Sequence, residues 1–171
     1  MHSYVTTGPH LLKRILKSLH VVGAAGMIGA LTAHIILLTV TPPPNDLADY
    51  ALMRAGIAAI AKWLLLPSLG VVLISGLLAM AAHRPFIYAR WVWFKLGLGI
   101  VVFEGTLIGV QGPAVRAAEV SALALTGQVD PGIINELVTR EWGSLWVILA
   151  VALVNVLLAV WRPSLQRAAS S

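Results

Sequence analysis

The sequence predicts an all-α integral membrane protein, a bundle of four transmembrane helices with both termini in the cytoplasm. Of its 171 residues, 58% are hydrophobic and only 11% are charged, and the mean hydropathy is +0.87. A typical soluble domain carries about 25% charged residues, and a soluble chain of this length could not bury so much apolar surface. Composition therefore excludes a soluble enzyme and a disordered chain. The length fits one compact unit, a single membrane domain over residues 1–171.

Four apolar segments are long enough to cross a bilayer, since a spanning helix needs about 20 apolar residues. Each is followed by a turn that contains proline, which cannot continue a helix because it lacks an amide hydrogen. The predicted spans are residues 18–40, 56–82, 91–110 and 144–160, and residues 112–143 are predicted as an outer loop. Helical composition over 114–125 and 132–140, with a break at 127–131, predicts one or two short helices near the interface within that loop.

The distribution of charge predicts the orientation of the four spans. Basic residues gather on one side of the predicted crossings: Lys13, Arg14, Lys17, Arg84, Arg90, Arg162 and Arg167. The other side holds Asp46, Asp49, Glu119, Asp130, Glu136 and Glu141, with Arg54, Arg116 and Arg140. The positive-inside rule then places both termini in the cytoplasm, in a bacterial cytoplasmic (inner) membrane. The net charge of +5 thus reflects topology, and no nucleic-acid partner is expected.

Ionisable residues inside a predicted span are functional candidates, because a charge in lipid is costly. His34, Lys62 and Glu104 each lie six or seven residues from the outer end of their spans, roughly 10 Å deep at 1.5 Å per residue. The sequence therefore predicts an outer polar layer in which Lys62 and Glu104 neutralise each other. Two interpretations stay open, a proton, ion or cofactor site and a buried pair that only fixes the register of the helices.

A second, inner layer is predicted from His20, Lys95 and His83. His20 lies three residues beyond Lys17 and Lys95 lies five beyond Arg90, so the two side chains should be level. Lys95 and His83 also have structural interpretations. Lys95 can extend its ammonium to the headgroups, and His83 can be an interfacial histidine. The sequence has no cysteine, which excludes disulfides, thiolate metal sites, iron–sulfur clusters and covalently attached haem.

The first span carries the clearest pattern of possible ligands. His20, Met27 and His34 recur every seven residues and so share one face of a helix, accompanied by Gly23, Gly26, Gly29 and Ala30. Small residues let another helix, or a flat cofactor, approach closely. Two stacked haems would need matching histidines on other spans, which are missing. One haem with His20 as an axial ligand fits, with His83, Met80, a water or nothing on the other side.

Three segments carry a resemblance: Leu16–Gly23, Lys62–Pro67 with Ser75–Leu77, and Trp91–Leu96. In this order they resemble a group of small bacterial membrane proteins that includes uncharacterised four-span families, the membrane domain of copper-resistance protein D and the HemJ-type protoporphyrinogen oxidases. In the HemJ-type enzymes a histidine early in the first span and a lysine at the start of the third are functionally important, with haem b bound. His20 and Lys95 match these positions. The resemblance implies that His20 binds haem iron and that Lys95 pairs with a propionate or a substrate carboxylate.

The leading functional hypothesis is a membrane protein that binds haem b for electron transfer or porphyrin oxidation, with His20, Lys95 and His83 at the cofactor. The alternative is a small transporter, a channel-like protein or an accessory subunit that uses the layer of His34, Lys62 and Glu104. A third interpretation is a scaffold in which the buried charges set helix register. The expected partners are the lipid bilayer, a redox partner or another membrane subunit, and further copies of the chain.

Overall fold

In the computed structural model, residues 8–43, 46–82, 90–129 and 132–161 are described, and these ranges are helical and contain no strand. The structure confirms the predicted all-α class, with four helical rods long and apolar enough to cross a membrane. The helices are α1 (Gly8–Val40), α2 (Leu47–Ile60), α3 (Leu66–Ala81), α5 (Arg90–Thr106), α6 (Gly112–Leu125) and α7 (Gly132–Trp161). The π-helical turn η1 (Ala61–Leu65) joins α2 to α3, and the π-helical turn η2 (Leu107–Gln111) joins α5 to α6.

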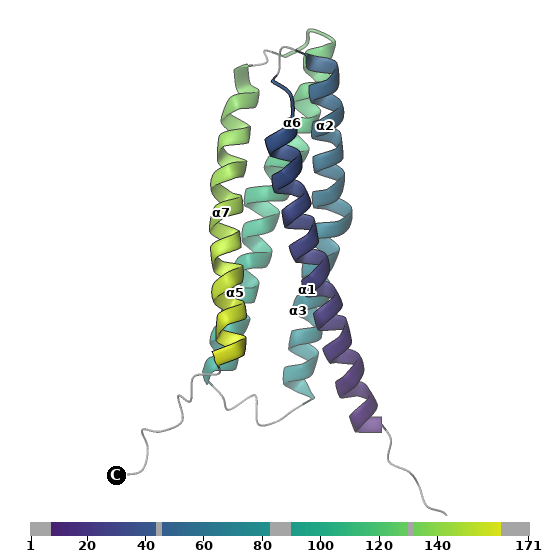
Figure 1. Ribbon diagram of the computed structural model, residues 1–171, viewed down its shortest axis with the longest axis vertical. Coiled ribbons are helices and arrows are strands. Elements are labelled where there is room, and N and C mark those ends of the chain that lie inside the picture. The colour runs from purple at the N-terminus through teal and green to yellow at the C-terminus, as the bar shows by residue number, and fades with distance from the viewer. Residues whose placement is uncertain (1–7, 44–45, 83–89, 130–131, 162–171) are drawn as a thin grey trace, which may run out of the picture.

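The four rods form one elongated bundle (Figure 1). The helix α1 packs along α3, α3 packs on α5, and α5 packs along α7, while α2 packs along α6. The helix α1 begins and α7 ends at the same end of the bundle, which we call the terminal end. The opposite end holds the end of α1, the start of α2 and the turn between α6 and α7 (Figure 1). An even number of helical rods explains why the start of α1 and the end of α7 lie at one end of the bundle.

The segment 112–143 was predicted as an outer loop with one or two short helices, and helices do form over Gly112–Leu125 and from Gly132 onward. They continue the third and fourth rods, which corrects the prediction of a separate outer loop. The helix α6 continues the third rod from Gly112, and α7 already begins at Gly132. Pro113 does not end the rod because it stands in the first turn of α6, where a missing amide hydrogen is tolerated. The predicted break does occur. Gly127 has a φ of 69° and closes α6 in a Schellman motif, with the Gln128 amide donating to the carbonyl of Leu123.

Both π-helical turns stand directly before a proline. The Leu66 amide donates to the Ala61 carbonyl just before Pro67, and the Gly112 amide donates to the Leu107 carbonyl just before Pro113. A proline removes one donor from the helical ladder, and a wider turn lets the helix pass the proline without ending. The second rod therefore passes Pro67 through a π-turn. The same device carries the third rod past Pro113.

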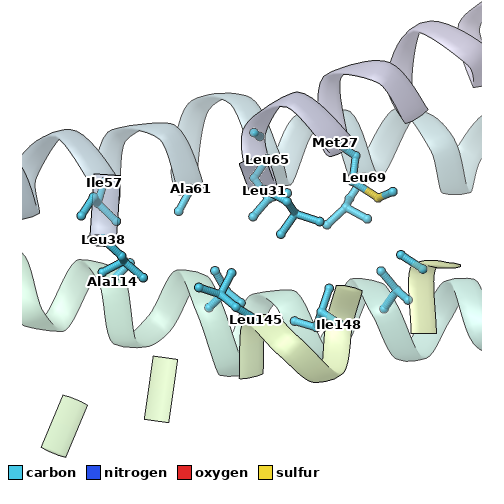
Figure 2. Packing of buried hydrophobic residues seen from close by; sticks show 14 residues of the cluster. Met27, Leu31, Leu38, Ile57, Ala61, Leu65, Leu69, Ala114, Leu145 and Ile148 are labelled. Carbon is cyan, nitrogen blue, oxygen red and sulfur yellow. The ribbon is translucent and has the colours of Figure 1, made fainter. Parts of the chain in front are cut away.

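The bundle has a narrow core and an apolar outer surface. Side chains from all four rods meet along the axis, where Met27 and Leu31 of α1 lie opposite Leu145 and Ile148 of α7 (Figure 2). Many large apolar side chains instead face outward, as Ile108 does at 76% exposure. Exposing so much apolar surface to water would be unfavourable, so the outer surface of the bundle fits a lipid environment.

The predicted small-residue seam of α1 lies against α3 at two of its glycines. A Cβ atom at Gly23 would stand 3.0 Å from the backbone oxygen of Ser68, and one at Gly26 would stand 2.5 Å from the Ser68 hydroxyl. At Gly29 a Cβ atom would meet nothing within 4 Å. The seam therefore extends over Gly23 and Gly26 and does not include Gly29.

Replacing Gly23 by alanine is expected to lower the free energy of unfolding relative to Gly29→Ala by about 1–3 kcal/mol, since added volume forces packed backbones apart. Both changes are Gly→Ala within one helix, so the gain in helix propensity is shared and cancels in the comparison. Thermal unfolding in detergent measures the difference. Equal melting temperatures for the two variants would contradict the close packing of α1 on α3.

Candidate functional site

The terminal half of the bundle contains a cavity of about 820 Å³ between α1, α3, α5 and α7. Figure 1 shows the pair α1 and α3 diverging from the pair α5 and α7 toward this end. The wall is mostly aliphatic. Its polar side chains are His20, Ser75, Lys95 and Asn155, and Lys13 and Lys17 also line it. A largely apolar cavity of several hundred Å³ with a few polar groups is typical of a small-molecule or cofactor site.

His20 is held in one orientation by α3. Its Nδ1 atom lies 3.0 Å from the carbonyl oxygen of Val72 and 3.1 Å from the hydroxyl of Ser75. The Ser75 hydroxyl donates its own hydrogen to the same carbonyl at 3.1 Å. Because a carbonyl oxygen can only accept, Nδ1 carries the hydrogen, and in the neutral imidazole the lone pair is on Nε2. This is the hydrogen-bonding pattern that orients a metal-binding histidine.

The structure brings Lys95 to the same cavity as His20, as the inner layer required. Lys95 is half-buried on α5, while Lys13 and Lys17 of α1 are exposed. The polar wall is therefore cationic near His20. His83, the third predicted member of this layer, lies outside the described residues. Met80, considered as a second axial ligand, is 8% exposed and also lines the cavity.

Asn155 adds a polar group that the sequence analysis did not consider. It lines the cavity from α7, and its buried Oδ1 atom has no hydrogen-bond partner in the described part of the protein. A buried acceptor without a donor costs about 1–3 kcal/mol. This atom is therefore available to a donor on a molecule in the cavity.

The outer polar layer differs in membership from the prediction. His34 is fully buried, as expected, but its Nε2 atom lies 2.6 Å from Oε1 of Glu141. The other carboxylate oxygen of Glu141 accepts from Nη2 of Arg54 at 2.5 Å. All three side chains are 0% exposed. The layer is thus a three-residue network of α1, α2 and α7, which we call the buried triad.

Lys62 and Glu104 do not join His34 in this layer. Both side chains are exposed on the outer surface of the bundle, and in the described ranges no ion pair links them. Lys62 instead lies 5.3 Å from the ring centroid of Trp63. Counting residues from the end of a span gives the depth of a side chain, but it does not give the direction in which the side chain points.

Arg54 and Glu141 were not predicted as site residues, because both lie beyond the ends of the apolar spans. A signal for them exists in the helical period. Tyr50, Ala51, Arg54 and Ile57 form one buried face of α2. Glu141 likewise follows Ile134 and precedes Leu145 on the buried face of α7. Extending the period beyond the apolar spans would have placed both charges inside the bundle.

The buried triad is incompletely paired. Within the part of the chain that the structure describes, Nδ1 of His34 and Nε and Nη1 of Arg54 have no hydrogen-bond partner. Such buried atoms ordinarily bind water or another ligand. The triad therefore retains free hydrogen-bonding capacity after the contacts to Glu141 are made.

No group of three or more histidine, cysteine, aspartate or glutamate side chains that could hold a metal ion occurs in the described ranges. A porphyrin supplies four nitrogen ligands itself and needs only an axial side chain, which suits His20, the one histidine among the described residues that line the cavity. Comparisons with protein-family models, curated proteins and solved structures gave no match. The function is therefore inferred from the geometry of the chain itself.

Proposed function

We propose that this integral membrane protein binds one haem b in the terminal cavity and serves in electron transfer. The single observation that carries the proposal is the hydrogen bonding of His20, which leaves Nε2 as the atom with a lone pair. A backbone carbonyl behind the ring fixes both the tautomer and the ring orientation of an iron ligand. In this proposal His20 is the axial ligand and the terminal end faces the cytoplasm, as the exposed Lys13, Arg14 and Lys17 support.

The size and lining of the cavity fit a flat, amphipathic cofactor. Its volume of about 820 Å³ lies in the upper part of the range for ligand pockets. Aliphatic side chains such as Leu69 and Val102 would pack on the macrocycle and exclude water. Lys95 would bind a propionate by a charge-assisted hydrogen bond. These features suit a cofactor with an apolar body and an anionic edge.

The residues around the proposed haem have distinct roles. His20 supplies the axial nitrogen, and Ser75 and the carbonyl of Val72 are positioning groups that hold its ring. Lys95 fixes the anionic edge. Bound haem would supply one-electron iron chemistry, and the surrounding core would set its potential by limiting access of water.

The test is the haem content of protein purified from cells supplied with a haem precursor. About one haem b per chain, with an absorption spectrum that changes on reduction, is expected. Colourless protein that also fails to take up haem after purification would overturn the proposal. Covalent attachment is not expected, because the chain has no cysteine, so acid acetone should extract all the haem.

The buried triad favours a second candidate function, proton or ion handling at the opposite end of the bundle. Its support is the unpartnered Nδ1 atom of His34 beside a fully buried charge pair. A histidine on a carboxylate can exchange a proton, and ionisable groups inside membrane proteins often mark such paths. In this second candidate function, the Glu141 carboxylate accepts the proton or binds the ion that crosses the membrane.

Flux measurements in proteoliposomes separate the second candidate from the first. Glu141→Gln should abolish a proton or ion flux that Glu136→Gln preserves, since Glu136 is exposed and paired only with Arg140. Haem content should be equal in the two variants. No wild-type flux of protons or small ions would remove this candidate and leave the haem proposal unchanged.

A further inference from the structure

The outward-facing surface of the described spans carries two charges far from either end. Glu104 lies twelve residues before the exposed Arg116, about 18 Å along the helix, and Lys62 lies thirteen residues after the exposed Asp49, about 20 Å. The surrounding outward positions are apolar, among them Trp63 at 73% and Ile108 at 76% exposure. A charge facing lipid at such a depth is costly and is usually paired or directed into a protein interior.

Glu104 has no partner in the part of its own chain that the structure describes. No hydrogen bond or ion pair involves its carboxylate. A carboxylate also has a short stem and cannot extend to the headgroups as a lysine can. A positive charge or a hydrogen-bond donor from beyond these residues would remove the cost of placing this carboxylate in lipid.

The chain itself presents the complementary charge at a similar level. Lys62 lies in η1, which contacts η2, and Glu104 stands three residues before the start of η2. Less than one helical turn therefore separates Glu104 from the level of these two turns. The lysine stem is long enough to cover the remaining offset. Among the described residues, the polar contact of the Lys62 ammonium is with the face of Trp63, which leaves it able to bind a carboxylate.

The outward face of α5 around Glu104 suits helix packing. Its exposed members Phe94, Gly97 and Val101, and Ile108 of the following η2, recur at three- or four-residue spacing with Glu104 among them. A Cβ atom at Gly97 would meet nothing within 4 Å, so the backbone is open to a close approach there. Membrane helices associate through such small residues and through polar contacts across the interface.

We propose that a second copy of the chain covers this face, with Lys62 of each copy bound to Glu104 of the other. A twofold dimer repeats every contact, so one lysine and one glutamate per chain give two ion pairs. Pairing neutralises all four charges within the apolar layer of the membrane. The inference uses none of the cavity residues and does not depend on haem binding.

The test is the association of charge-reversed chains in liposomes, measured by single-molecule photobleaching with two colours. Wild-type chains form dimers. Lys62→Glu alone and Glu104→Lys alone each bring like charges together, so each dissociates with a dissociation constant raised by more than about tenfold. A mixture of the two variants forms mixed dimers, because both contacts across the interface are again between opposite charges.

The mixture distinguishes a contact between chains from one within a chain. A lysine–glutamate pair inside one chain would be broken in both variants, and mixing them would not restore it. The proposal is overturned if either variant alone dimerises like wild type, or if the mixture stays monomeric while both variants keep the wild-type melting temperature. Should charge reversal impair folding, Lys62→Met with Glu104→Gln replaces it, and an unchanged dissociation constant overturns the proposal.

Discussion

Glu141→Gln is expected to lower the free energy of unfolding by about 3–5 kcal/mol, the usual cost of removing one partner from a buried ion pair. The glutamine keeps the size of the side chain but removes the charge that compensates Arg54, which is 0% exposed and lies 2.5 Å from the carboxylate. It also removes the anionic acceptor of His34 at 2.6 Å. An Arg54 cation left without a counter-charge inside the bundle accounts for most of the loss.

Unfolding in mixed detergent micelles measures the change, and Glu136→Gln is the matched control. Glu136 is 69% exposed and pairs with Arg140 one helical turn away, so its loss should change stability by no more than about 0.5 kcal/mol. A stability loss for Glu141→Gln equal to that of the control would show that the carboxylate does not hold Arg54.

A triple apolar replacement distinguishes a scaffold from a working site. Changing His34 to leucine, Arg54 to methionine and Glu141 to leucine together removes the charges without leaving one unpaired, and the product should be as stable as wild type or more stable. If the triad only fixes helix register, this variant should also keep all activity. Loss of a flux with full stability would assign the triad a working role.

His20→Ala is expected to lower the affinity for haem by more than about 100-fold. Loss of a group that merely orients a metal ligand already costs 10–100-fold, and this change removes the proposed ligand itself. The alanine leaves a space beside Ser75 and the Val72 carbonyl, the two groups that contact the His20 ring. Added imidazole should enter that space and restore part of the Soret absorption.

Titration of haem into the purified protein, followed by absorbance, gives the affinity. Ser75→Ala is the graded control, because the Val72 carbonyl still accepts from Nδ1 at 3.0 Å in that variant. We expect an intermediate affinity for it, since one of the two positioning groups remains. Equal affinity of wild type and His20→Ala, with both proteins folded, would show that His20 is not the ligand.

Hydropathy predicted the four rods because each contains a long apolar run, and those runs are what cross a membrane. Hydropathy did not predict where each helical rod begins and ends. The chain remains helical through Pro67 and Pro113, because a π-helical turn before each proline accommodates the missing donor. Proline as a stop signal holds for a regular α-helix, and neither rod is regular at that point.

The candidate site could be predicted in part. His20, Met27 and His34 were placed on one face by period alone, and α1 does bury Met27 and His34 while His20 lines the cavity. The partners of His34 could not be found by depth, because depth does not specify direction around a helix. Lys62 is an example, because its side chain is exposed on the outer surface of the bundle.

The buried triad and His20 divide the bundle into two polar regions along α1. His20 and His34 are fourteen residues apart, about 21 Å along the helix axis. Met27, Ala30 and Leu31 lie between them and are all buried in the apolar core. The two regions are therefore separated by packed aliphatic side chains, and changes in one should leave the other intact.

Electron–nuclear double resonance of the oxidised, haem-loaded protein tests the central claim most directly. With ¹⁵N-labelled histidine, the account predicts a strong coupling of the iron to one histidine nitrogen, the Nε2 atom of His20, which disappears in His20→Ala. Haem-loaded wild type that lacks a histidine coupling, or a coupling that persists unchanged in His20→Ala, would contradict the account.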